Sequence, residues 1–185
     1  MKTIPIILAS ASPERAAILK STLNFDVKPA DINETPLENE NAEALVERLA
    51  IQKAQFIHSS SAHTISADTI IEFDGENIGK PKNKNHAKNT ILKLMGKVFN
   101  VWTSTVILLN NNDLCFKTEA ATLTLKVMND TQLEIYLNSN IWVGKAGAFS
   151  INDPNCPAKI IKGDLDSVRG ISLSFINDTL SKMQS

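Results

Sequence analysis

The sequence predicts a mixed α/β fold, a single domain over residues 1–185 built around one elongated, partly antiparallel sheet. Strand-like and helix-like patterns alternate along the chain, which is typical of strands covered by helices. Two long β-branched segments separated by a short polar turn add an antiparallel hairpin. Because no internal repeat or low-complexity linker divides the chain, we expect one domain rather than two.

The chain begins with a strand followed by a helix. The continuous apolar run Ile4–Ala9 is typical of a buried strand. Ser12 then provides an N-cap, and Pro13 occupies the first helical position, where its missing N–H is not needed. We expect this helix to extend over Pro13–Leu23, because its apolar residues recur at helical spacing.

A long polar connection separates this pair from a second helix. After a short strand at Phe25–Val27, the segment Asp31–Asn41 contains Pro36 and many Asn and Glu residues, which discourage regular structure. The second helix is expected over Ala42–His58, where Leu, Ala and Ile residues keep a helical period.

Turn residues divide the rest of the chain into shorter elements. A capping-box pattern, Thr131 with Glu134, indicates the start of one of the helices. The expected elements are a strand at Thr64–Phe73, a return strand from Ile78, a helix at Asn85–Met95, a hairpin of Val98–Leu109 and Leu114–Val127, a helix from Thr131 to Asn138, strands at Ala148–Ile151 and Ala158–Ile161, and a terminal helix after Ile171.

Composition argues against two classes of partner. With 19 Lys and Arg against 20 Asp and Glu, the formal net charge of -1 leaves no basic excess to bind a nucleic acid polymer. The hydrophobic runs fall far short of the roughly 20 residues that a membrane helix needs, and the apolar N-terminal run is too short for a secretory signal. We therefore expect a cytoplasmic protein that binds neither nucleic acid polymers nor membranes.

The turn after the first strand suits a phosphate group. Ser10 and Ser12 bring hydroxyls, and Arg15 a cation, to a strand-to-helix turn where backbone N–H groups meet the positive end of the helix dipole. The alternative interpretation is an ordinary N-cap, with Arg15 solvated on the first turn. The sequence contains no P-loop motif.

Charged residues elsewhere complete a set with recognisable chemistry. Asp68 lies among apolar and β-branched residues, where a carboxylate must be paired, bound to metal or shifted in pKa; a purely structural Asp is an equal alternative. Glu34 adds a second carboxylate, and Arg48, Lys53 and Lys80 add cations that singly are typical of a surface. Together they suit divalent-metal-assisted attack of water on a phosphoanhydride.

In chain order, these segments resemble motifs of the Maf family of nucleoside triphosphate pyrophosphatases, which are also known for a suspected role in septum formation. The similarity covers nearly the whole chain, from about Ile6 to Ile176. The segments that resemble family motifs are Leu8–Arg15, Asn33–Thr35, Arg48–Ala54, Ser66–Thr69, Gly79–Pro81, Gly96–Thr103 and Gly144–Asn152.

The resemblance implies a fold similar to the inosine triphosphate pyrophosphatases, a homodimer, and hydrolysis of a nucleoside triphosphate to the monophosphate and pyrophosphate with Mg or Mn. It implies that Asp68 accepts the proton of the attacking water and shares the metal with Glu34. The positions that it assigns to the substrate are Ser10, Ser12, Glu14, Arg15, Lys53, Thr69, Lys80 and Asn152.

Two departures from the family pattern leave the nucleobase open. Glu14 replaces an arginine and puts an anion beside a polyanionic ligand, and Asn152 is one methylene shorter than the family's glutamine. Thr69 agrees with the dTTP and UTP class, but the three residues together match neither that class nor the 7-methyl-GTP class. The alternatives are a hydrolase of methylated nucleotides and a catalytically weakened nucleotide-binding or division-associated interaction protein.

Overall fold

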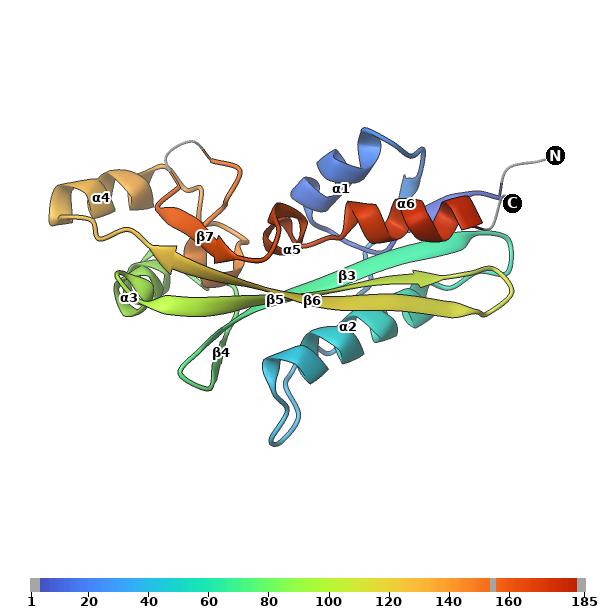
Figure 1. The fold of residues 1–185 in the computed structure, drawn as a ribbon, viewed down its shortest axis with the longest axis horizontal. Coiled ribbons are helices and arrows are strands. Elements are labelled where there is room, and N and C mark those ends of the chain that lie inside the picture. The colour runs from blue at the N-terminus through green and yellow to red at the C-terminus, as the bar shows by residue number, and fades with distance from the viewer. Residues whose placement is uncertain (1–3, 154–155, 183–185) are drawn as a thin grey trace. The chain divides into compact units, whose positions relative to one another are not determined.

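The computed structural model describes residues 4–153 and 156–182, which form a mixed α/β fold (Figure 1). Among these residues, no helix combines the length and the apolar composition needed to cross a membrane. The elements are β1 (Ile6–Leu8), α1 (Pro13–Lys20), β2 (Asp26–Val27), α2 (Ala42–Ile57), β3 (His63–Phe73), β4 (Glu76–Ile78), α3 (Lys84–Leu94), β5 (Val98–Leu108), β6 (Leu114–Leu125), α4 (Asp130–Asn138), the 3-10 helix η1 (Ala146–Ala148), β7 (Ala158–Lys162), α5 (Leu165–Arg169) and α6 (Leu173–Lys182).

The strands form one mixed sheet in the order β2-β1-β3-β5-β6-β7, with β4 paired to β3. β1 pairs in parallel with both β2 and β3, whereas the pairs β3 with β4 and β6 with β7 are antiparallel. The predicted hairpin is present as β5 and β6, which are neighbours in the sheet. The predicted mixed α/β class with a partly antiparallel sheet is therefore confirmed.

The described residues group into two compact units. The first contains those in Met1–Asp68, Thr103–Glu119 and Gly170–Ser185, and the second those in Thr69–Trp102 and Ala120–Arg169. The long strands β3, β5 and β6 contribute residues to both units. Because of this sharing, the prediction of one domain over residues 1–185 stays a prediction.

In the first unit, helices cover both faces of the sheet (Figure 1). Successive residues of β5 belong to different apolar clusters, because side chains alternate between the two faces of a strand. Ile107 packs in a cluster with residues of α1 and α6, whereas Val106 and Leu108 pack with Ala50 and Ala54 of α2. One face of the sheet is thus covered by α1 and α6, and the other by α2.

The same alternation directs the side chains of β3. Ile65 and Ala67 belong to the cluster of α1 and α6. Ser66, between them, points to the other face and donates a hydrogen bond to the carbonyl of Ala50 in α2 at 2.6 Å. Asp68 is two residues further along the strand, so its side chain also faces α2.

The second unit is built on a separate apolar core. Its buried residues include Ile91 of α3 and Leu137 of α4, packed with Ile71 of β3. Gly147 approaches Ile71 so closely that a Cβ there would lie 2.0 Å from Ile71 Cδ1, and its φ of +65° favours glycine. Its N–H donates to the carbonyl of Gly79 at 3.1 Å. This hydrogen bond fixes the backbone immediately before Lys80.

One predicted helix signal is wrong, and one helix is present that was not predicted. The N-cap of α4 is Asn129, which forms a capping box with Gln132, so the predicted box of Thr131 and Glu134 is displaced by two residues. The terminal helix expected after Ile171 is present as α6, and the helix α5, which was not predicted, precedes it. Gly170, with a φ of 87°, separates the two helices, because a residue in the left-handed region interrupts a right-handed helix.

Strand predictions fail where the backbone turns. The expected strand Ala148–Ile151 is absent, because η1 ends at Ala148 and both Gly147 and Ala148 have positive φ angles that an extended strand excludes. β4 ends at Ile78 rather than beginning there. The other predicted elements are present with shifted ends, such as α1, which stops at Lys20 instead of Leu23.

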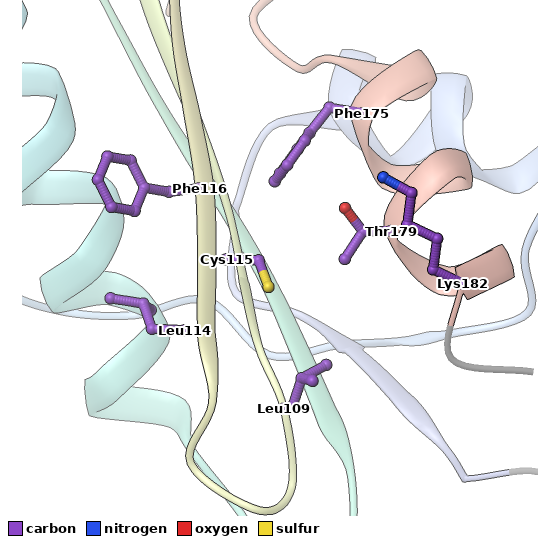
Figure 2. A pocket seen from close by; sticks show the side chains of 7 residues that line it. All are labelled: Leu109, Leu114, Cys115, Phe116, Phe175, Thr179 and Lys182. Carbon is purple, nitrogen blue, oxygen red and sulfur yellow. The ribbon is translucent and has the colours of Figure 1, made fainter.

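A mostly apolar pocket lies in the first unit beside the end of the hairpin of β5 and β6 (Figure 2). Cys115 of β6 lines it together with Phe175, Thr179 and Lys182 of α6. None of the predicted site residues is among its lining residues. The pocket is therefore separate from the predicted chemistry.

We predict that His63 makes stability depend on pH. His63 is buried at the start of β3, and its Nδ1 accepts the N–H of Asn110 at 3.2 Å. Burial lowers its pKa from the ordinary value of 6.5, so the unfolded chain binds this proton more readily than the native protein does. The contribution of the neutral His63 to the free energy of unfolding is therefore fully present above about pH 6.5. It is lost as the pH falls below that value, because the unfolded chain then takes up the proton.

The measurement is urea denaturation between pH 7.5 and pH 5.5. His63→Asn, whose Oδ1 can accept the same N–H, should lose less unfolding free energy over this range than the wild-type protein. His86→Asn is the matched control, because Nδ1 of the exposed His86 also accepts a backbone N–H, that of Lys82. An equal loss in wild-type protein and His63→Asn would contradict the prediction.

Candidate functional site

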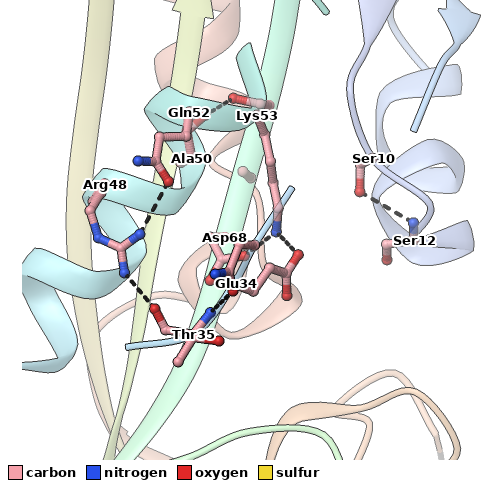
Figure 3. A network of polar contacts seen from close by, with 12 residues as sticks. Ser10, Ser12, Glu34, Thr35, Arg48, Ala50, Gln52, Lys53 and Asp68 are labelled. Atoms are coloured by element: carbon pink, nitrogen blue, oxygen red, sulfur yellow. Dashed lines mark hydrogen bonds and ion pairs between the residues drawn. The ribbon is translucent and has the colours of Figure 1, made fainter. Parts of the chain in front are cut away.

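Three predicted site residues meet in the first unit (Figure 3). Nζ of Lys53 lies 2.5 Å from Oδ1 of Asp68 and 2.6 Å from Oε1 of Glu34. Lys53 comes from α2 and Asp68 from β3, while Glu34 lies in the connection between β2 and α2. One ammonium group thus bridges two carboxylates from distant parts of the sequence.

Burial differs strongly within this group. Asp68 is 8% exposed and Lys53 is 7% exposed, whereas the Glu34 side chain is 49% exposed. A carboxylate as buried as Asp68 is costly unless a cation or hydrogen bonds compensate its charge, and Lys53 supplies both. The bridge therefore extends from the interior at Asp68 to the surface at Glu34.

Lys53 occupies a core position of α2. The buried residues of this helix include Val46, Leu49, Ala50 and Ile57, and Lys53 continues their spacing of three, four and seven residues. Lys53 is buried with these residues, and its long side chain lets the ammonium reach the carboxylates. A lysine at an apolar position of an amphipathic helix is thus a sequence signal for this site.

The Ser10 to Arg15 turn has the predicted helix start. Ser12 is the N-cap of α1, its Oγ accepting the N–H of Arg15 at 3.4 Å, and Pro13 is the first helical residue. The N–H of Ser12 in turn donates to Oγ of Ser10 at 3.2 Å (Figure 3). The turn is therefore held by its own two serines.

The alternative interpretation is right about the Ser12 N-cap but wrong about Arg15, which is not solvated on the first turn. Its Nε donates to the carbonyl of Gly170 at 2.7 Å, and its Nη1 donates to the carbonyl of Ala67 at 2.8 Å and to Oγ of Ser10 at 3.3 Å. Ala67 directly precedes Asp68 in β3. Arg15 thus joins the serine turn to the strand that carries the buried carboxylate.

Electrostatics also connect the turn with the carboxylates. Burial lowers the pKa of Arg15 from its ordinary value, while the negative charges of Asp68, Glu34 and Glu14 act in the opposite direction. Glu14 adjoins Arg15 in the first turn of α1, where an anion is also favoured by the helix dipole. The guanidinium therefore lies within the field of three carboxylates.

Arg48, expected among the cations of the site, binds a carboxylate in this structure. Its Nε lies 2.6 Å from Oε1 of Glu40 and its Nη2 lies 2.7 Å from Oε2 of the same carboxylate. It also contacts Thr35 and Gln52 (Figure 3). Glu40 was not among the predicted site residues, because its pairing across eight positions from a loop to a helix follows no sequence period.

The other predicted residues belong to the second unit. Thr69 is partly buried in β3, and Lys80 is exposed just after Gly79. The exposed Asn152 accepts a hydrogen bond from Nε of Arg169 at 2.7 Å, and Arg169 was not predicted. The roles of Thr69, Lys80 and Asn152 beside a substrate stay predictions.

The two carboxylates have the chemistry that a hard divalent cation requires. Mg²⁺ is usually bound by one or two protein carboxylates, with waters and substrate phosphates as further ligands. Glu34 and Asp68 already contact one common cation, the Lys53 ammonium. Among the described residues, no group of three or more His, Cys, Asp and Glu could hold a metal ion. The pair thus fits a divalent ion whose other ligands are waters or substrate phosphates.

Comparison with known proteins gives consistent results. The model of a family described as Maf-like protein matches residues 5–183. A dTTP/UTP pyrophosphatase from Lacticaseibacillus casei is 35% identical over 175 residues, which cover 92% of this chain and 95% of that protein. A dTTP/UTP pyrophosphatase from Methanococcoides burtonii is 33% identical over 184 residues, 96% of this chain and 94% of that protein.

Among solved structures, a HAM1 protein from Coxiella burnetii matches 97% of this chain and 100% of its own, with a TM-score of 0.58 at 14% identity. At this identity the likeness shows the fold alone. The two proteins therefore share their α/β architecture.

We predict that Lys53→Met strongly destabilises the protein. The substitution keeps an unbranched apolar stem but leaves the buried Asp68 without its cation, which should lower the free energy of unfolding by about 3 kcal/mol. Adding Asp68→Asn should restore part of that loss, so a double-mutant cycle measured by urea denaturation should show coupling.

Lys84→Met is the matched control, since it breaks an exposed ion pair with Glu134 and should cost under about 1 kcal/mol. Equal losses for the two lysine substitutions would show that the Lys53 bridge contributes no more than a surface pair.

Proposed function

Because the chain belongs to the Maf-like protein family, we propose that it is a nucleoside triphosphate pyrophosphatase, which hydrolyses its substrate between the α and β phosphates to the monophosphate and pyrophosphate. Relatives named dTTP/UTP pyrophosphatase, which are 33–35% identical over nearly the whole chain, support this assignment. The observation that carries it is the Lys53 bridge between Glu34 and Asp68, coupled through Arg15 to a phosphate-ready turn.

dTTP and UTP are the proposed substrates. The names of the relatives support them, and so does Thr69, which agrees with the dTTP and UTP class of the family. Glu14 and Asn152 depart from that class, so discrimination among bases must rest partly on other contacts. The modified nucleotides form the second group of candidates.

Glu34 and Asp68 are the proposed ligands of Mg²⁺ or Mn²⁺. When bound, such an ion offsets phosphate charge and increases the acidity of a coordinated water. Lys53 can exchange one of its carboxylate partners for a phosphate oxygen, because both are anionic oxygens that accept from an ammonium group.

The remaining residues have roles that follow from their positions. Asp68 is the proposed proton acceptor for the attacking water, since it is a carboxylate on a rigid strand. Ser10, Ser12 and the backbone N–H groups at the start of α1 suit the phosphates, where negative charge grows on the leaving pyrophosphate. Arg15 adds positive charge and holds the turn against β3.

A panel of triphosphates tests the proposal. Purified protein with Mg²⁺ or Mn²⁺ should release pyrophosphate from dTTP and UTP, and the panel should also contain the other common triphosphates and 7-methyl-GTP. No release from any of them by folded protein would overturn the proposal. Tight triphosphate binding without turnover would instead support a nucleotide-binding protein, an alternative that the departures at Glu14 and Asn152 favour.

Asp68→Asn should reduce kcat by at least about a hundredfold, because the amide has nearly the same shape but is a poor base. Circular dichroism of the variant should remain that of folded protein. Near wild-type turnover would show that Asp68 is structural.

Charge at position 14 should set the affinity for the triphosphate. Glu14 lies beside Arg15, where its negative charge opposes a polyanion. We predict that KM falls in the order wild type, Glu14→Gln, Glu14→Arg, with little change in kcat, in steady-state assays of pyrophosphate release. Since an acidic residue in the first turn also stabilises α1, the melting temperature of each variant is the control. A KM that stays constant or rises across the series would contradict the prediction.

A further inference from the structure

The loop that carries Glu34 has no regular structure of its own. Residues 28–41, between β2 and α2, form neither strand nor helix, and residues 33–39 are exposed. A loop of this kind loses conformational entropy whenever it is held in one place. The position of Glu34 against Lys53 therefore depends on contacts made by other residues of the loop.

Arg48 of α2 makes those contacts. Its guanidinium donates two hydrogen bonds to the carboxylate of Glu40, at 2.6 and 2.7 Å, in a bidentate arrangement. Nη2 also donates to the carbonyl of Thr35 at 3.2 Å, and Thr35 directly follows Glu34. Glu40 in turn accepts the N–H of Leu37 at 2.9 Å through Oε2. Arg48 thus reaches both ends of the segment from Thr35 to Glu40.

This pair differs from an ordinary surface ion pair. The Glu40 side chain is 7% exposed and that of Arg48 is 21% exposed. The Arg48 hydrogen bonds lower the pKa of Glu40, and Glu40 raises the pKa of Arg48, so both groups stay charged at neutral pH. Gln52, one turn along α2, accepts from Nη1 at 3.1 Å and restrains the guanidinium.

Arg48 thereby attaches the loop to α2, a helix that is itself firmly packed. α2 packs on the sheet through Ala50 and Ala54, and the carbonyl of Ala50 accepts from Ser66 of β3. The same helix carries Lys53, which binds the Glu34 side chain. Two adjacent loop residues, Glu34 and Thr35, are therefore both bound by side chains of α2.

We propose that Arg48 and Glu40 are positioning residues that hold Glu34 in place for the metal. The inference rests on the proposed function, because it concerns the metal affinity of the Glu34 and Asp68 pair. Neither residue takes part in the chemistry. The ion pair of Arg48 and Glu40, which we call the clasp, acts only by holding the loop that carries Glu34. Loosening it should weaken metal binding and leave turnover at saturating metal intact.

The test compares wild-type protein with Glu40→Gln, Arg48→Lys and the control Glu38→Gln. Glu38 is an exposed acid of the same loop, so Glu38→Gln changes the net charge as Glu40→Gln does without touching the clasp, while Arg48→Lys keeps the net charge. Mn²⁺ affinity is measured by calorimetry without nucleotide, and kcat and the apparent KM for Mg²⁺ are measured with dTTP. Amide hydrogen exchange follows residues 31–40, and the β3 amides report whether each variant is folded.

Glu40→Gln and Arg48→Lys should each weaken Mn²⁺ binding about tenfold, the effect typical of residues that support metal ligands. They should raise the KM for Mg²⁺ similarly, speed exchange in the loop and leave kcat within about twofold, since Asp68 and Lys53 are untouched. Glu38→Gln should behave as wild type.

If the wild-type protein binds Mn²⁺ and both clasp variants bind it with the same affinity, this inference is overturned while the proposed function stands. A fall in kcat without a change in metal affinity would also overturn it, as would unfolding of both variants, which would assign the pair to the fold as a whole. A wild-type protein that binds no Mn²⁺ would instead overturn the proposed metal site itself, and the inference with it.

Discussion

A charged carboxylate on a buried strand is the constraint around which this site is arranged. Asp68 lies in the interior of the first unit, where an unpaired negative charge would be strongly unfavourable. The compensation comes from Lys53, which must itself be drawn into the interior to reach it. This pairing therefore fixes the position of α2 on the sheet. It also places a lysine where an apolar residue would otherwise lie.

The rest of the site follows from that pairing. The Lys53 ammonium also binds a second carboxylate, that of Glu34, which reaches it from the surface. Arg15 comes from the opposite side of β3 and binds the carbonyl of Ala67, next to Asp68. Charges of both signs thus lie close together, which suits the proposed binding of a metal cation and a phosphate anion, because each would meet partners of opposite sign.

The parts of this site differ in how firmly they are held. Asp68 and Lys53 belong to a strand and a helix that are joined by the hydrogen bond from Ser66 to the carbonyl of Ala50, and Arg15 is tied to the backbone at two carbonyls. Glu34 lies on a loop without strand or helix, in which residues 33–39 are exposed. Such a distribution is suited to a site where the base must stay rigid while metal and substrate enter and leave.

Local patterns in the sequence determined the fold class and most of the elements. The Ser12 and Pro13 helix start, the helical period of α2 and the apolar surroundings of Asp68 depend on neighbours in the chain, so they could be predicted and are present. The resemblance to family motifs also selected Glu34, Lys53 and Asp68 together. Only the tertiary structure decided that one ammonium bridges the two carboxylates and that Arg48 binds Glu40. These pairings join residues from separate elements, and their energies depend on burial and distance, which no sequence period encodes.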